Sequence, residues 1–240
     1  VQTCALPIYT GAELAAQKGM RVVLFEQNAL GGTCLNVGCI PTKTILHAVN
    51  HGQKDWNAIQ RRKTVVVRKL AAGIKQRLQG VNLVNGRAEE VERVGSHYLV
   101  RCNGERYEAQ HLLIATGSSN LVPPIPGIAD NPAIWNSTDA LNATELPKSI
   151  IIIGGGVIGM EFATIYKQLG LRVTVVEALP RVLANIDEDI VQLLVQKYQR
   201  EGVQILTNTK VTAFEGNIVH TTAGSLVADK VLVWVGREPN

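Results

Sequence analysis

A glycine-rich turn between a strand and a helix constrains this sequence more than any other feature. The run SIIIIGGGVIGMEFA places Gly154, Gly156 and Gly159 in a G-x-G-x-x-G spacing directly after an apolar strand at residues 150–153. The first glycine permits a tight turn, the second lets a pyrophosphate approach the backbone, and the third lets the helix pack closely on the strand. The run therefore predicts a dinucleotide site at the amino end of a helix over residues 157–169.

An acidic residue follows this turn at the distance that the same kind of site requires. The next strand, residues 172–176, ends at Glu177, which lies 18 positions beyond Gly159. A carboxylate there accepts hydrogen bonds from the ribose hydroxyls of NAD and repels a 2′-phosphate. The sequence predicts NAD rather than NADP, bound by Gly154, Gly155, Gly156, Val157, Ile158, Gly159 and Glu177.

A second, similar unit precedes this one in the chain. Residues 15–26 match residues 166–177 at five positions when both are aligned on their closing glutamates, Glu26 and Glu177. Strands that alternate with helices predict an α/β fold, and the repeat predicts two Rossmann-like domains that bind similar ligands, with short antiparallel β meanders. We expect a first domain at residues 1–147 and an NAD-binding domain at residues 148–240.

Local patterns predict the individual elements. A proline-rich stretch at residues 118–147 predicts a connection, and residues 30–38 predict a loop. The remaining patterns predict helices at residues 10–18, 41–51, 56–79 and 187–200, and strands that include residues 21–25 and 111–114.

Composition and charge exclude several classes of protein. With 46% hydrophobic residues among 240, the chain can bury a core, and its apolar runs are far shorter than the roughly 18 residues of a membrane span. The net charge of +4 is concentrated at residues 51–80, where eight basic side chains against Asp55 give +7 and leave −3 elsewhere. No aromatic residues interleave with these charges, so we interpret them as a solvated helix face and predict neither nucleic-acid nor membrane binding.

The segment GGTCLNVGCIPTK, residues 31–43, contains two of the four cysteines. Cys34 and Cys39 are separated by four residues, which is close enough for a local disulfide. Two buried thiols or half of a zinc site are alternative interpretations. The nearest histidine, His47, has no second cysteine pair to join, so we favour a reversible dithiol beside a flavin and predict no metal.

The same segment resembles the redox-active segment of the flavin-dependent pyridine nucleotide disulfide oxidoreductases, and its wording is most similar to that of the dihydrolipoyl dehydrogenases. The resemblance extends from about Tyr9 onward. It includes the Ala-Thr-Gly turn at residues 115–117, the stretch AIWNSTDAL at 133–141 and the closing VGREPN.

The resemblance implies a role for each matching residue. Cys34 would be the interchange thiol that attacks the substrate disulfide, and Cys39 would be the thiol nearest the flavin. Lys43 and Glu161 resemble a buried ion pair near the flavin. The implied FAD contacts are Glu26, Gly31, Gly32, Thr33, Cys34, Lys43, Ala88, Thr116 and Gly117, and the further implied NAD contacts are Val211, Gly236 and Arg237.

Both ends of the chain depart from the family pattern. The family opens with a strand and its own G-x-G-x-x-G, whereas this sequence has VQTCALPI, so we expect the FAD domain to be incomplete. Our hypothesis is that residues 1–8 are foreign sequence and that Cys4 has no function. The family also closes with an interface domain that supplies a catalytic histidine and glutamate across a dimer, and none of the five histidines here has such a setting.

The resemblance implies a cytoplasmic, homodimeric flavoprotein that oxidises the lipoyl group of a 2-oxo acid dehydrogenase complex and makes NADH. We expect these 240 residues to be inactive alone, as an N-terminal fragment. A mercuric reductase or another flavin-linked disulfide reductase is an alternative. A nucleotide-binding module without turnover is another.

Overall fold

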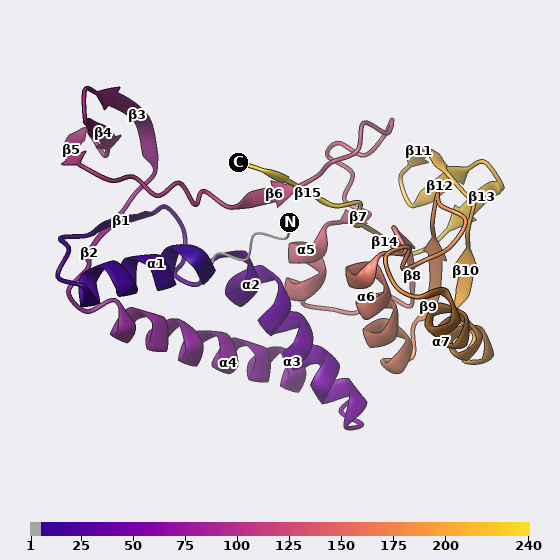
Figure 1. Ribbon diagram of the computed structural model, residues 1–240. Coiled ribbons are helices and arrows are strands. Elements are labelled where there is room, and N and C mark those ends of the chain that lie inside the picture. Colours follow the sequence, from indigo (N-terminus) through magenta and orange to yellow (C-terminus); the bar gives the residue numbers. More distant parts are fainter. Residues whose placement is uncertain (1–5) are drawn as a thin grey trace. The chain divides into compact units, whose positions relative to one another are not determined.

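The computed structural model describes residues 6–240, with side chains from residue 8 onward (Figure 1). Cys4 and most of the octet VQTCALPI therefore lie outside the described residues. The chain forms two compact units. Unit 1 contains the residues up to Ile40, residues 65–118 and the last two residues, and unit 2 contains residues 41–64 and 119–238.

Unit 2 is built on a parallel sheet of five strands. Their order is β10 (Gln204–Leu206), β9 (Arg172–Val176), β8 (Ser149–Ile153), β14 (Lys230–Val233) and β7 (Ile134–Trp135). All five residues of the central strand β8 are buried, which a run of four β-branched isoleucines favours in a sheet covered on both faces.

Side chains alternate along β8 and supply a separate core on each face. Ile150 and Ile152 pack in one cluster with α6 (Val157–Gln168) and α7 (Glu188–Arg200). Ile151 and Ile153 pack on the opposite face with the antiparallel strands β11 (Val211–Glu215) and β12 (Ile218–Thr221), which β13 (Gly224–Val227) extends. The turn that follows β8 is therefore held by a sheet with two buried faces.

Unit 1 has a smaller parallel pair, β1 (Val23–Glu26) with β2 (Asn82–Asn85). Helix α1 (Leu6–Gln17) packs on it through a buried cluster of Tyr9, Ala12, Leu24 and Leu78. Three antiparallel strands follow, namely β3 (Ala88–Val94), β4 (His97–Cys102) and β5 (Glu105–Ala109). The remaining elements of the chain are not confined to unit 1. They are α2 (Gly32–Val37), α3 (Cys39–Asn50), α4 (Trp56–Arg77), α5 (Ser137–Asn142) and the paired strands β6 (Ser118–Asn120) and β15 (Arg237–Pro239).

The predicted α/β class with parallel sheets and antiparallel meanders is confirmed. Three local predictions were wrong. Residues 111–114 form no strand, since no strand pairs with them within residues 6–240, and Leu113 and Ile114 are exposed. The predicted loop at 30–38 contains α2, and the predicted connection at 118–147 contains β6, β7 and α5, whose start at Asn136 is fixed by a capping box with Asp139.

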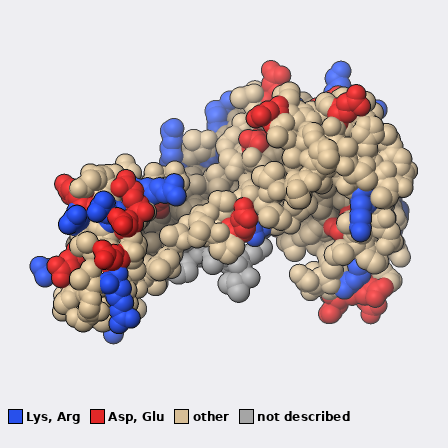
Figure 2. Space-filling model, turned by 90° about the horizontal axis from the view of Figure 1, so that it is seen from above, with Lys and Arg blue, Asp and Glu red and all other residues tan. Residues whose placement is uncertain are grey.

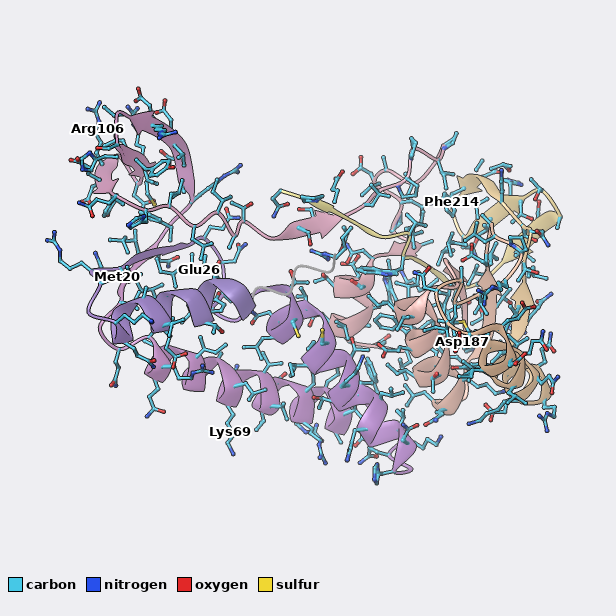
Figure 3. The ribbon with its side chains drawn as sticks, in the orientation of Figure 1. Met20, Glu26, Lys69, Arg106, Asp187 and Phe214 are labelled. Carbon is cyan, nitrogen blue, oxygen red and sulfur yellow. The ribbon has the colours of Figure 1, made fainter. Side chains whose placement is uncertain are left out.

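Most of the basic segment forms α4, whose charged side chains are exposed except for Lys63. Lys69, for example, points away from the helix into solvent (Figure 3). Lys63 is 7% exposed and donates to the Leu141 carbonyl at 2.5 Å, so the prediction of a wholly solvated face was wrong at this residue. Acidic and basic side chains are interspersed on the face shown in Figure 2. Among the described residues, no helix is long and apolar enough to cross a membrane.

Candidate functional site

The turn after β8 has the close contacts that require glycine. Gly154 has a φ of +106°, and a Cβ atom there would lie 2.0 Å from the Trp234 carbonyl oxygen. A Cβ at Gly159 would lie 2.0 Å from the Gly154 carbonyl oxygen. Gly156, which caps α6, differs because a Cβ there would meet nothing within 4 Å. The first and third glycines are thus needed for packing, whereas the second leaves open space at the amino end of the helix.

The Glu177 carboxylate is fixed against this turn. Its Oε2 accepts a hydrogen bond from the Gly155 amide at 2.7 Å, and its Oε1 accepts one from the Leu179 amide at 2.8 Å. A carboxylate that is held in this way keeps acceptor positions for ribose hydroxyls. With the open amino end of α6, where Val157 is 51% exposed and Ile158 follows, the arrangement fits a dinucleotide.

The other predicted NAD contacts are Val211, Gly236 and Arg237. Val211 and Gly236 follow segments whose backbone lies close to Glu177 and Gly154. The Thr209 amide donates to the Glu177 carbonyl at 3.0 Å, which brings the start of β11 at Val211 near this turn. Trp234, which contacts Gly154, is two residues before Gly236. Arg237 donates to the Asn120 side chain, and burial lowers the pKa of its guanidinium.

Unit 1 brings together the predicted ribose carboxylate and the glycine turn before the dithiol. Glu26 closes β1 and lies beside α1 (Figure 3). Its Oε2 accepts from the Tyr9 hydroxyl at 2.7 Å, and its Oε1 accepts from the Asn28 amide at 3.0 Å. Gly31 and Gly32 have φ values of +106° and +59° and lead into α2. The carboxylate and the left-handed glycines fit the ribose side of FAD.

Three other predicted FAD contacts lie elsewhere in unit 1. Thr33 is in α2, Ala88 begins β3, and Thr116 lies in an irregular segment. The Thr116 hydroxyl donates to the Asn240 carbonyl at 3.2 Å, and the Asn240 amide nitrogen donates to the Gly117 carbonyl at 3.2 Å. The 116–117 turn is thus hydrogen-bonded to the last residue of the chain.

The two cysteines of the predicted dithiol lie at a junction of two helices. Cys34 is half-buried in α2, and Cys39 is exposed at the first position of α3. Between the helices, a Cβ at Gly38 would lie 2.9 Å from the Thr33 carbonyl oxygen and 3.3 Å from the Cys34 Cα. Glycine therefore lets the chain turn back closely past Cys34. Cys102 differs, because it is fully buried and burial raises the pKa of its thiol.

Lys43 and Glu161 form an ion pair between α3 and α6 within unit 2. The structure thus joins two residues that are 118 positions apart in sequence. The Lys43 side chain is 57% exposed and the Glu161 side chain is 20% exposed. Within residues 6–240, no group of three or more His, Cys, Asp or Glu side chains could hold a metal ion.

A comparison with protein families assigns the chain to one of them. The model of the pyridine nucleotide-disulphide oxidoreductases matches residues 9–240. The chain belongs to this family. Its members use FAD and NAD(P), so the predicted cofactors are confirmed at the level of the family.

The individual relatives in the family include dihydrolipoyl dehydrogenases and RclA. A dihydrolipoyl dehydrogenase of Acholeplasma laidlawii is 35% identical, with 96% of this chain and 79% of that protein covered. The probable pyridine nucleotide-disulfide oxidoreductase RclA of Escherichia coli is 36% identical, with 96% and 54% covered. One solved structure of RclA, described as a HOCl-induced flavoprotein disulfide reductase from Escherichia coli, superposes with a TM-score of 0.87 at 35% identity, with 97% of this chain and 55% of that chain covered.

The chain spans little more than half the length of most of these relatives. A dihydrolipoyl dehydrogenase of Mycoplasma genitalium, 34% identical, matches over 97% of this chain and 56% of its own.

Sequence reasoning missed two residues that contact the segments around the predicted nucleotide-binding residues. Arg181 donates through its guanidinium to the carbonyls of Ile186 and Ala184 at 2.8 and 2.6 Å, and so fixes the loop after Glu177. Tyr9 binds Glu26 in unit 1. No sequence motif marks either side chain.

Proposed function

We propose that the whole protein is an NAD-linked dihydrolipoyl dehydrogenase, within the flavoprotein disulfide oxidoreductase family. The observation that carries the NAD assignment is the Glu177 carboxylate bound to the Gly155 amide at the dinucleotide turn. The GGTCLNVGCIPTK segment and the dihydrolipoyl dehydrogenase relatives support the substrate. The proposed net reaction converts dihydrolipoamide and NAD to lipoamide, NADH and a proton.

The residues of the chain have separate proposed roles in this reaction. A substrate thiolate attacks the Cys34 sulfur of a Cys34–Cys39 disulfide, and the second substrate thiol then displaces Cys34. The substrate is oxidised to a disulfide and the two cysteines are reduced to thiols, so electrons and sulfur bonds balance. FAD, when bound, supplies the two-electron acceptor. Lys43 is held by Glu161 near Cys39 in sequence, and we assign this pair to orienting the flavin side of the dithiol.

Two features of unit 2 support NAD over NADP. Glu177 places a negative charge where a 2′-phosphate would lie. Arg181 is the nearest cation in the following loop sequence, and its guanidinium is engaged by two backbone carbonyls. Two of the Arg181 donors are therefore bound to the loop backbone instead of being available to the extra phosphate.

The remaining proposals concern the whole protein. In sequence, residues 1–147 supply the FAD contacts and residues 148–240 the NAD contacts. The proposed partners are a lipoyl group of a 2-oxo acid dehydrogenase complex and a second copy of the protein, in the cytoplasm. A histidine and glutamate from the family's interface domain would complete the acid–base chemistry.

Reconstitution with FAD tests the proposal directly. The chain is incubated with FAD, desalted and reduced with two electrons from dithionite. Retained flavin absorbance and a long-wavelength charge-transfer band that is lost in Cys39→Ser but kept in Cys102→Ser would support the dithiol assignment. NADH binding without retained flavin would contradict the dithiol assignment for these residues. It would support the alternative, a nucleotide-binding module without turnover.

A second candidate is favoured by the similarity to RclA, one structure of which is described as a Cu(II) complex. Here the whole protein would be a flavoprotein disulfide reductase that reacts with a substrate other than lipoamide. NADH oxidation by the whole protein with lipoamide, compared with NADH oxidation with Cu(II), separates the two candidates. Faster turnover with lipoamide would support the first, and turnover with Cu(II) alone would support the second. A mercuric reductase would instead turn over Hg(II).

A further inference from the structure

The Tyr9 side chain is buried in unit 1 and fixed by polar contacts. Its residue is 6% exposed and packs with Ala12, Leu24 and Leu78. The hydroxyl donates to Glu26 Oε2 at 2.7 Å. Because a buried hydroxyl needs partners, this contact fixes both the phenol ring and the carboxylate. Burial, together with the neighbouring carboxylate, raises the pKa of Tyr9, so the phenol remains a donor at neutral pH.

In unit 2 the two oxygens of the Glu177 carboxylate accept hydrogen bonds in the same arrangement as those of Glu26. In both glutamates, Oε1 accepts from the amide two residues farther along the chain. The Oε2 atom of Glu177 accepts from the Gly155 amide, whereas that of Glu26 accepts from the Tyr9 hydroxyl. The phenol thus takes the place that a glycine-turn amide has in the NAD half. Each carboxylate oxygen has two lone pairs, so positions for ribose hydroxyls remain.

The Tyr9 oxygen also reaches the turn that carries the dithiol helix. Leu30, next to this turn, packs against the cluster that contains Tyr9. The Gly31 and Gly32 backbones act on the phenol in the direction that favours its ionised form, as amide N–H groups near the oxygen do. Both glycines have positive φ, and α2 with Cys34 begins at Gly32. The Tyr9 side chain therefore lies between the Glu26 carboxylate and the glycine turn that leads into Cys34.

We propose that Tyr9 is a positioning residue that orients the Glu26 carboxylate for the adenosine ribose of FAD and holds the Gly31–Gly32 turn against it. The FAD part rests on the proposed function. The part that concerns the turn depends only on contacts within unit 1. Tyr9 touches neither the dithiol nor the reacting atoms, so it acts through Glu26 and the turn.

Tyr9→Phe in the full chain removes the hydroxyl and keeps the ring. Tyr107→Phe is the matched control, because the Tyr107 hydroxyl also donates to a carboxylate at 2.7 Å, that of Glu105, but on the antiparallel strands of unit 1. Hydrogen–deuterium exchange measures the Gly31 and Gly32 amides, and flavin fluorescence measures the Kd for FAD. We expect at least tenfold faster exchange and at least tenfold weaker FAD binding in Tyr9→Phe, with NADH binding unchanged and neither effect in Tyr107→Phe.

Two results would overturn the proposal. Unchanged exchange at both glycine amides would show that the phenol does not hold the turn. Equal FAD affinity in wild type and Tyr9→Phe would show that it does not orient the ribose site, while the proposed function would stand. If the wild type binds no FAD, the proposed function fails for this chain, and with it the ribose role of Tyr9, whereas the exchange measurement still decides the role at the turn.

A second variant covers the case in which Tyr9→Phe does not fold. Glu26→Gln keeps the size of the acceptor and weakens its bond to the phenol, because the charge is lost. Faster exchange at Gly31 and Gly32 in this variant would support the proposal, and wild-type exchange would contradict it.

Discussion

Units 1 and 2 place the glutamates that end β1 and follow β9, Glu26 and Glu177, in the same hydrogen-bonding pattern with different donors. In unit 2 the second carboxylate oxygen is bound by the Gly155 amide, and in unit 1 it is bound by the Tyr9 hydroxyl. A backbone donor depends only on the local fold, whereas a phenol can be removed by mutation and can ionise. The comparison shows that one carboxylate geometry can be fixed either by a turn or by a single side chain.

The halves differ as well in the sheet that holds the turn. Strand β8 has five buried residues and a strand on either side. In β1 only Leu24 is buried, and among the described residues β1 pairs with β2 alone. A turn that follows a strand buried on both faces has little freedom to adjust, so substitutions at the turn should cost most in unit 2.

The largest expected effect would come from Gly159→Ala, which tests this rigidity. The new Cβ would lie 2.0 Å from the Gly154 carbonyl oxygen, so α6 would have to move away from β8. We expect a loss of roughly 3 kcal/mol or more in the free energy of unfolding, measured by urea denaturation. Gly156→Ala is the matched control within the same motif, because its Cβ meets nothing; it should keep the stability and weaken NADH binding. Equal destabilisation by both variants would contradict this account.

The next largest effect is on cofactor binding and tests the role of the Glu177 carboxylate. Glu177→Gln removes the charge but keeps the shape. Since hydrogen bonds to a charged acceptor contribute more than neutral ones, we expect the NADH Kd to rise roughly tenfold to a hundredfold. The NADPH Kd should change less, because repulsion of the 2′-phosphate is also lost. Isothermal titration with both cofactors measures the change, and an unaltered preference for NADH would mean that Glu177 does not select the cofactor.

Much of unit 2 was predictable because its signals are local. Four consecutive isoleucines, a glycine fingerprint and a terminal glutamate determine the strand, the turn and the ribose carboxylate within 29 residues of sequence, 149–177. Unit 1 was less predictable, because Tyr9 meets Glu26 through the tertiary packing of α1 on β1. The same limit explains residues 111–114, whose apolar pattern favours a strand although pairing depends on a neighbour that sequence periodicity does not specify.

A smaller effect on stability should come from Trp56→Phe in the core of unit 2. The Trp56 indole nitrogen donates to the buried Ala143 carbonyl at 2.8 Å, and the variant leaves that carbonyl without this partner. We expect a loss of about 1 to 2 kcal/mol in the free energy of unfolding. NADH binding should remain at the wild-type value, since Trp56 is far from the glycine turn in sequence and its indole hydrogen bond goes to Ala143. A change in NADH affinity with unchanged stability would be the opposite of this expectation.

The smallest effect is confined to alkaline pH and separates the two carboxylate donors. Burial raises the pKa of Tyr9 above the ordinary value of 10.0, so in the unfolded chain this phenol ionises at lower pH than in the folded chain. Its contribution to stability is therefore complete below about pH 10 and is lost as pH rises toward the folded-state pKa.

The difference in free energy of unfolding between wild type and Tyr9→Phe isolates this contribution, because the other tyrosines are common to both proteins. We expect a constant difference from pH 7 to about pH 9 and a progressive decrease above about pH 10. Unit 2 provides the contrast: the Gly155 amide that binds Glu177 does not ionise in this range, so the wild-type NADH site should keep its geometry while the Tyr9 contact weakens. A difference that stays constant above pH 10 would mean that Tyr9 titrates alike in both states, and the phenol would then not be the buried donor that distinguishes unit 1.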